Sequence, residues 1–220
     1  MGRDSQNDDV RSRVLDAARR LFIERGYEQT TIREISVASG VSSGSLYHFF
    51  SDKEGVFLHL TLEVFEGTLQ AAASAAARYR DPHLGLSLKW AFLVRLISTD
   101  RRLAELFSVA YGSWKISEAL LRVATQRHQL LLGGVLDSWD QERFFIATLV
   151  LAGVLSALVE ERVNLDCLSE EKRVRALLST ALPAFGARPE KIQGLIEKTL
   201  ELLSSITLSS VGFGEGDHRA

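Results

Sequence analysis

The sequence predicts an all-α protein with an N-terminal three-helix helix-turn-helix domain followed by a helical bundle. Long segments are rich in Ala, Leu, Glu and Arg, which favour helices, and no segment alternates apolar and polar residues as a strand does. The 220 residues include only three prolines, so few positions interrupt a helix. Because 46% of the residues are apolar, a chain of this length can bury a core.

The first two helices are delimited by clear boundary signals. One helix is expected from Val10 to Arg25, where apolar residues recur at helical spacing and Gly26 follows as a stop. Thr31 and Glu34 form a capping box, in which each side chain bonds the other residue's backbone amide, so a second helix starts there. Gly40 ends this helix, since glycine adopts the left-handed backbone of a tight turn.

The later helices are predicted in the same way. Ser42 can cap a third short helix that ends at Phe49 or Phe50, so two short helices meet across a tight turn. A further capping box at Ser51 to Glu54 opens a long helix from Lys53 to Tyr79, long enough to connect two bodies. Other helix starts are predicted at Asp81-Pro82, Ser113, Asp140, Ser169 and Pro189, which gives about nine or ten helices.

These elements define the expected domain organisation. Residues 1–9 are polar and acidic, and residues 209–220 are polar and rich in glycine, so both ends are expected to be disordered. Between them, residues 10–55 form the helix-turn-helix domain and residues 56–208 form the larger helical domain.

The amino-acid composition indicates the cellular location of the protein more clearly than its function. The formal charge of -2 and the isoelectric point of about 6.2 do not indicate a nucleic-acid-binding protein. The single Cys167 cannot form an internal disulfide, and the first residues do not resemble a secretion signal, which predicts a cytoplasmic protein. The most apolar run, Phe144 to Val159, is shorter than the roughly 20 residues that cross a bilayer, so we expect a buried helix and no membrane segment.

One region carries a specific motif. The pattern comprises Gly26-Tyr27, Thr30 to Ile32, Ile35, Ala38, Gly40 to Ser42, Leu46-Tyr47, Phe49-Phe50 and Lys53-Glu54. It resembles the DNA-binding domain of the tetracycline-repressor (TetR) family. The resemblance implies that the third helix recognises DNA, with Leu46 packed inward, Tyr47 and His48 touching DNA, and Lys53 meeting a phosphate.

The residue types agree with that assignment. A small core can form from Ile35, Ala38, Val41, Leu46 and Phe50, which leaves the polar residues of the third helix facing outward. Small hydroxyl residues and a glycine let a helix N-terminus approach phosphates and base edges closely. The predicted DNA-binding residues are Thr31, Arg33, Ser42, Ser43, Gly44, Ser45, Tyr47, His48 and Lys53. Many relatives carry Lys or Arg where this chain has Ser43, so base preference at that position cannot be transferred.

For residues 56–208 the resemblance is architectural and implies a domain that binds an effector and dimerises. Aromatic residues and one arginine lie where relatives line their pocket and indicate a small, largely apolar or aromatic effector: Trp90, Phe92, Arg95, Phe107, Tyr111 and Trp114. Arg95 stands in an apolar stretch and needs a partner, which is either an anionic effector or water.

The resemblance also implies a homodimer in which two antiparallel helices of each subunit form the interface. The candidates are residues 141–164 and Ser169 to Leu182, and the first carries a stripe of small residues: Thr148, Ala152, Gly153, Ser156 and Ala157. The alternative is that this stripe packs within its own subunit. A dimer places two recognition helices about 34–36 Å apart, which predicts a palindromic operator in double-stranded DNA.

The predicted function is therefore a dimeric transcriptional repressor that a small-molecule effector releases from DNA, with the helix from Lys53 to Tyr79 as the connection. An activator and a helical adaptor without DNA binding remain alternatives. An enzyme is disfavoured, because no nucleophile motif is present and no pair of histidines has metal-ligand spacing; they are His48, His59, His83, His128 and His218. No cofactor or metal is predicted.

Overall fold

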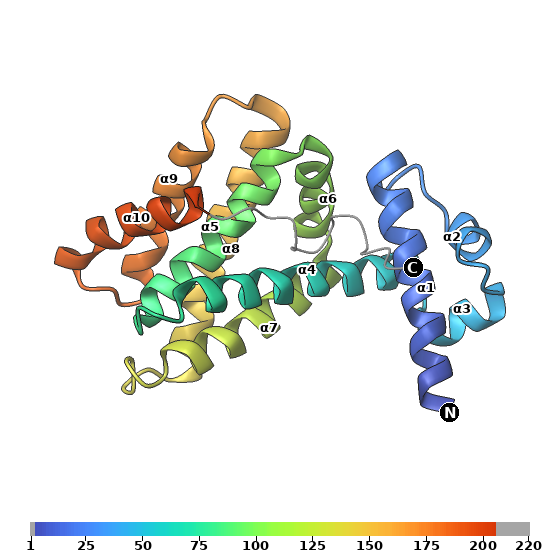
Figure 1. Cartoon of the computed structure of the whole chain (residues 1–220), viewed down its shortest axis with the longest axis horizontal. Helices are drawn as coiled ribbons and strands as arrows, with labels where there is room; N and C mark the ends of the chain where they lie inside the picture. The colour runs from blue at the N-terminus through green and yellow to red at the C-terminus, as the bar shows by residue number, and fades with distance from the viewer. Residues whose placement is uncertain (1–2, 206–220) are drawn as a thin grey trace. The chain divides into compact units, whose positions relative to one another are not determined.

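The computed structural model describes residues 3–205, which contain only helices and no strand (Figure 1). The all-α prediction is confirmed. The helices are α1 (Arg3–Arg25), α2 (Ile32–Ser39), α3 (Ser43–Phe49), α4 (Lys53–Ala76), α5 (Pro82–Thr99), α6 (Arg101–Gly112), α7 (Trp114–Leu132), α8 (Gln141–Glu160), the π-helix η1 (Glu161–Leu165), α9 (Glu170–Ala184) and α10 (Pro189–Ser204). The chain forms two compact units, and the division between them falls within α4, after Phe65.

The first unit contains α1, α2, α3 and the first turns of α4. Its core is built from buried apolar side chains of all four elements: Val14, Ala18, Leu21, Phe22, Ile35, Val41, Leu46, Phe50, Val56, Phe57 and Leu60. The ring of Phe57 packs edge-on against Phe22 at 5.4 Å and lies 4.8 Å from the ring of Tyr27. Because α4 supplies part of this core, the unit extends ten residues beyond the expected boundary at 55/56, to Phe65.

The N-terminal helix is longer than the sequence pattern predicts. It begins at Arg3 instead of Val10, so residues 3–9 are helical and the expected disorder of residues 1–9 is wrong for them. An ion pair of 3.2 Å between Asp9 and Arg13, one turn apart, supports the added turns, and acidic residues near a helix N-terminus interact favourably with its dipole. Residues 1–2 and the predicted disordered tail 209–220 lie outside the described residues.

The second unit is organised around α5, which is buried at nearly every position from Leu84 to Ile97. This helix packs against α6, α7, α9 and α10, while α8 packs against α7 and α9 (Figure 1). A helix surrounded on most sides needs apolar residues all round, which explains why α5 shows no single apolar stripe in the sequence.

The helix starts predicted for the second unit are confirmed. Side chains at four of the predicted positions cap their helices, namely Asp81, Ser113, Asp140 and Ser169, and Pro189 opens α10. The long helix α4 ends at Ala76, three residues before Tyr79. One start lacked a prediction: Asp100 caps α6 by accepting a hydrogen bond from the Arg102 amide.

The apolar helix of the second unit is buried on one face only. By length and composition the stretch Gln141–Leu165 could cross a membrane. Within this unit its inner face is formed by Phe144, Leu151, Leu155 and Leu158, which are buried as α8 packs against α7 and α9. The expectation of a buried helix is therefore correct only for its inner face.

Candidate functional site

The N-terminal end of α2 is held by the predicted capping box. The Thr31 hydroxyl accepts from the Glu34 amide at 3.2 Å, and Glu34 Oε2 accepts from the Thr31 amide at 2.8 Å. These hydrogen bonds lower the pKa of the Glu34 carboxyl below its usual value. The Thr31 hydroxyl also donates to Glu34 Oε2, so it is already engaged within the unit.

The turn between α2 and α3 has a defined geometry. Gly40 has a φ of 65°, in the left-handed region that favours glycine. Buried serine hydroxyls bond the turn from inside: Ser36 donates to the Val41 carbonyl at 2.6 Å, and Ser39 donates to the Ser36 carbonyl at 3.1 Å. With Val41 and Leu46 buried beside them, these bonds fix how α3 follows α2.

The outward face of α3 carries the predicted recognition residues. Ser42, Ser43, Gly44, Ser45, Tyr47 and His48 are all exposed, and Tyr47 keeps 53% of its surface accessible. Leu46 is fully buried, as predicted from its place in the motif. Ser42 caps α3 by accepting from the Ser45 amide at 3.2 Å, and it donates to the Ser45 hydroxyl.

Gly44 stands at an open position. A Cβ placed there would meet no atom within 4 Å, so packing within the unit does not require glycine. Its absent side chain instead leaves the N-terminal turn of α3 accessible to an external surface, as close approach to a DNA backbone requires. This observation supports the prediction that this turn faces DNA.

The remaining predicted residues of the first unit are Lys53, Arg33 and Ala38. Lys53 Nζ donates to the Tyr27 carbonyl at 2.8 Å and lies 4.0 Å from the Tyr27 ring centroid, so it also holds the loop after α1. An ammonium has three donors, and the phosphate contact stays a prediction for the others. Arg33 is exposed. Ala38, expected in the core, is also exposed, because Ile35, Ser36 and Ser39 form the buried face of α2.

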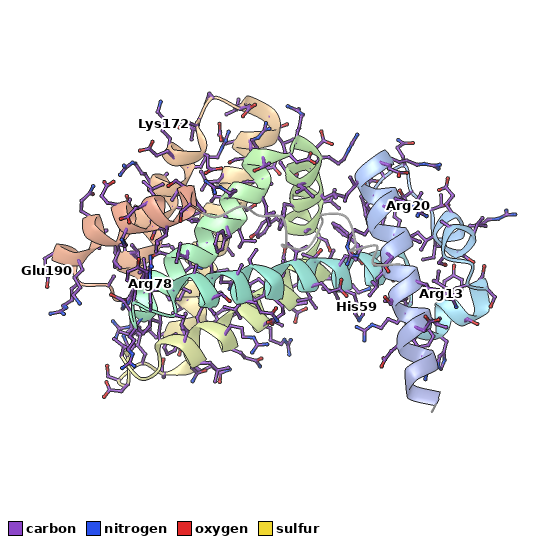
Figure 2. All side chains as sticks on the ribbon, in the orientation of Figure 1. Arg13, Arg20, His59, Arg78, Lys172 and Glu190 are labelled. Carbon is purple, nitrogen blue, oxygen red and sulfur yellow. The ribbon has the colours of Figure 1, made fainter. Side chains whose placement is uncertain are left out.

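The first unit carries exposed arginines, of which Arg13 pairs with Asp9 and Arg25 pairs with Glu34. They are Arg11, Arg13, Arg20, Arg25 and Arg33; Figure 2 labels Arg13 and Arg20 on α1. Seven Lys or Arg and six Asp or Glu between residues 11 and 55 leave a net charge of +1. With so small an excess, affinity for a phosphate backbone depends on where the charges lie.

The predicted effector residues fall into two groups. Tyr111 is half-buried, and burial of its phenol raises the phenol's pKa. Trp90, Phe92 and Phe107 are buried and belong to the interior of the second unit. Trp114 does not, because 81% of its surface is exposed at the first position of α7. Trp114 therefore lies on the surface of the second unit, and its contact with an effector stays a prediction.

Arg95 has partners within the chain. Its guanidinium donates to Glu170 at 2.7 Å and 3.1 Å and to the Leu203 carbonyl, so it links α5 to α9 and α10. Neither an anionic effector nor water is needed to compensate its charge. Sequence reasoning missed this pair because Glu170 is 75 residues distant.

The predicted dimer stripe is divided by the structure. Thr148 is buried and bonds His128 within the same subunit, so it is not available to a partner. Gly153 and Ala157 are exposed, and Ala152 and Ser156 are partly exposed. The same outer face carries large apolar side chains that the search for small residues passed over: Phe145, Ile146, Leu149 and Val150, each more than 40% exposed.

Three buried ionisable residues also escaped the sequence analysis, namely Lys89, His128 and Arg173. Lys89 and His128 are each about 1% exposed and belong to α5 and α7. Burial lowers the pKa of Lys89 to about 7, and burial with the charge of Lys89 lowers the pKa of His128 well below its usual value. An unusually polar residue inside an otherwise apolar run was the available signal for Lys89. Among residues 3–205, no cluster of His, Cys, Asp and Glu suited to a metal ion is found.

Two short helices joined by a tight turn, with a polar exposed face on the second, define a helix-turn-helix DNA-binding domain. Residues 14–60 match the family described as "Bacterial regulatory proteins, tetR family". Residues 14–60 therefore form a DNA-binding domain of the tetR type, which confirms the resemblance inferred from the motif.

Similar curated proteins match over the same region. The HTH-type transcriptional repressor AcnR of Corynebacterium glutamicum is 47% identical over 53 residues, which cover 24% of this chain and 28% of AcnR. The HTH-type transcriptional repressor KstR2 of Rhodococcus jostii is 52% identical over 46 residues, 21% of this chain and 22% of KstR2. The matched segment thus spans about a quarter of each relative's length.

Solved structures extend the likeness to the whole fold. RolR in complex with resorcinol has a TM-score of 0.68 at 21% identity, covering 89% of this chain and 97% of that chain. SmeT, the repressor of the Stenotrophomonas maltophilia multidrug efflux pump SmeDEF, has a TM-score of 0.57 at 24% identity, covering 80% and 91%. At these identities the likeness establishes a shared fold.

Proposed function

We propose that this chain is a sequence-specific DNA-binding transcriptional repressor that acts as a homodimer and leaves its operator when a small, largely apolar effector binds. The observation that carries the proposal is the exposed face of α3, presented by a domain of the tetR family. Tyr47 and His48 are exposed on α3, while their neighbour Leu46 is buried and anchors the helix.

The outer face of α8 supports the proposed homodimer. Four large apolar side chains are exposed on this helix, beside the small Gly153 and Ala157. Contiguous exposed apolar surface of this kind is typical of protein interfaces. A two-fold symmetric pair would present two copies of α3 to a palindromic operator with half-sites about 34–36 Å apart.

An aromatic interior supports the proposed effector. Trp90, Phe92 and Phe107 are buried in the second unit. Two proteins with this fold have been solved with small aromatic molecules, RolR with resorcinol and SmeT with triclosan. The helix α4 runs through the division between the units, so a change in its position is the direct route by which effector binding can alter the DNA-binding unit.

Relatives of the DNA-binding domain are transcriptional regulators, which supports a role other than catalysis and a cytoplasmic location. The sign of regulation follows from where the operator lies relative to the promoter, so a repressor is proposed on the names of these relatives.

A gel-shift assay of the purified full chain tests the proposal. The probe is the intergenic DNA upstream of its own gene, at moderate salt with nonspecific competitor, and light scattering establishes the oligomeric state in the same buffer. We expect a specific shift by a dimer. A folded dimer that shifts neither this DNA nor any fragment from a genome-wide selection would overturn the proposal and favour the adaptor.

A further inference from the structure

Three buried rings meet inside the second unit. Trp90 lies on α5, His128 on α7, and Phe185 at the C-terminal end of α9. The imidazole ring centroid lies 4.7 Å from that of Phe185 and 5.9 Å from that of Trp90, both edge to face, and the Trp90 and Phe185 centroids are 5.0 Å apart. Two polar atoms of this group, Trp90 Nε1 and His128 Nε2, are buried without a hydrogen-bond partner.

The proton positions on His128 follow from its neighbour. The Thr148 hydroxyl donates its single hydrogen to the Phe144 carbonyl at 2.8 Å. It can therefore only accept from His128 Nδ1, which lies 2.9 Å away. A neutral imidazole has one N–H, so Nδ1 carries the proton and Nε2 presents a lone pair. The indole of Trp90 is a donor only.

The interior thus contains one unpartnered acceptor and one unpartnered donor on neighbouring rings. Buried polar groups in proteins are nearly always satisfied, because leaving one unbonded costs free energy. The buried hydroxyls of Thr125, Thr148 and Thr199 follow that rule, each donating to a carbonyl of its own helix. His128 Nε2 and Trp90 Nε1 depart from this rule, which indicates that a bound molecule forms the missing hydrogen bonds.

We propose that Trp90 and His128 form the polar end of the effector site and select a small aromatic molecule that carries a hydroxyl group. A hydroxyl can donate to His128 Nε2 and accept from Trp90 Nε1–H, whereas a carboxylate or an ether offers no hydrogen to Nε2. The rings of Trp90 and Phe185 provide apolar surface for the aromatic part. This inference rests on the proposed function, since it specifies the effector of that regulator.

Lys89 favours the same chemistry. It lies next to Trp90 in the sequence, is buried, and acts electrostatically on His128. Glu66 and Arg127 are the charged groups that act on Lys89 in turn. A positive charge in this interior stabilises electron density on a hydroxyl oxygen, and aromatic hydroxyls bear more acidic hydrogens than aliphatic ones. Arg95, bound to Glu170, takes no part.

The test uses phenol and toluene as matched probes, because a hydroxyl and a methyl group are similar in size. Binding to the full chain without DNA is measured by calorimetry, and the imidazole nitrogens are followed by ¹⁵N NMR. We expect phenol to bind about tenfold more tightly than toluene, which corresponds to about 1.4 kcal/mol, and to move the Nε2 resonance of His128. Equal affinities, or an unmoved Nε2 resonance, would overturn the proposal and leave a resident water as the partner.

Two variants separate the polar atoms from the rings. His128→Phe and Trp90→Phe each remove an unpartnered polar atom and keep an aromatic side chain, so folding should be retained. We expect His128→Phe to bind phenol and toluene equally, and Trp90→Phe to lose part of the preference. Trp139→Phe, which alters an indole elsewhere in the unit, is the control and should keep it. If His128→Phe does not fold, the comparison of probes on the unmodified chain decides.

The gel-shift assay keeps the two proposals distinguishable. A protein that shifts its operator but does not prefer phenol contradicts only the effector inference. A protein that prefers phenol but shifts no DNA supports the site and contradicts the repressor.

Discussion

The two units bury their polar residues differently. In the first unit the buried polar side chains are hydroxyls, and each donates to a backbone carbonyl: Thr30, Ser36, Ser39 and Thr61. In the second unit, among the residues described, the buried polar side chains also include an amine, an imidazole and a guanidinium, those of Lys89, His128 and Arg173.

The two units therefore place their functional groups differently, on the surface in the first unit and in the interior in the second. The first unit has an uncharged core whose buried hydroxyls are all hydrogen-bonded, and its predicted contacts with DNA lie on the outside. The second unit buries ionisable groups, so its stability depends on the protonation of those groups and on any molecule that binds to them. Stability and recognition should therefore be separable in the first unit and coupled in the second.

The largest expected effect concerns the buried amine of the second unit. Burial lowers the pKa of Lys89 to about 7, whereas in the unfolded chain its value is near 10.5. Between these values the unfolded chain binds more protons, so the free energy of unfolding should rise with pH, by at most about 5 kcal/mol. The penalty is fully present below about pH 7 and is relieved toward about pH 10.

Urea unfolding of the full chain across this range measures that slope, and Lys89→Met should flatten it. Lys172→Met, an exposed lysine on α9, is the matched control and should leave the slope unchanged. A slope that is identical in the chain and in Lys89→Met would show that Lys89 titrates normally and would remove the contrast between the units.

A smaller effect should separate recognition from stability in the first unit. Tyr47→Ala removes an exposed ring on α3, so operator affinity should fall by about 10- to 100-fold while the free energy of unfolding changes by less than about 0.5 kcal/mol. Gel-shift titration and urea unfolding measure the two quantities. Arg188→Ala, exposed before α10, should change neither. Unchanged operator affinity in Tyr47→Ala would remove the recognition role of α3.

The smallest expected effect concerns the capping hydrogen bond at the start of α2, the helix that precedes α3. Thr31→Val removes the capping hydroxyl of α2 at nearly constant volume, and should destabilise the chain by about 1 kcal/mol. Thermal unfolding of the variant measures this loss. Thr99→Val is the comparison, since the exposed Thr99 hydroxyl bonds only a carbonyl of its own helix; equal losses in both would contradict the capping role of Thr31.

The fold was largely predictable because its signals are local. Capping residues such as Asp81 and Ser169 act within three positions of themselves, so the sequence alone places the helix starts. The burial of Leu46 and the exposure of Tyr47 were predictable for the same reason, since they depend on local spacing in a helix only two turns long.

The site in the second unit was not predictable, because its contacts join distant residues. Arg95 was expected to meet an anionic effector or to reach water, but Glu170 compensates its charge. Thr148 was expected at a dimer interface, but it bonds His128. Sequence patterns show that a residue is polar or small and do not show which helix packs beside it. The tautomer of His128 depends on three residues from two helices, a relation that no spacing rule contains.

The position of the unit division within α4 has a consequence for dissecting the protein. A fragment that stops at Gly55 would leave out Val56, Phe57 and Leu60, which complete the core of the first unit. In a chimera joined at Gly55, the α4 helix of another protein would replace Phe57 and would have to pack against Phe22 and Tyr27. The exchangeable module therefore extends to Phe65, and the family match, which ends at Leu60, already includes the beginning of this helix.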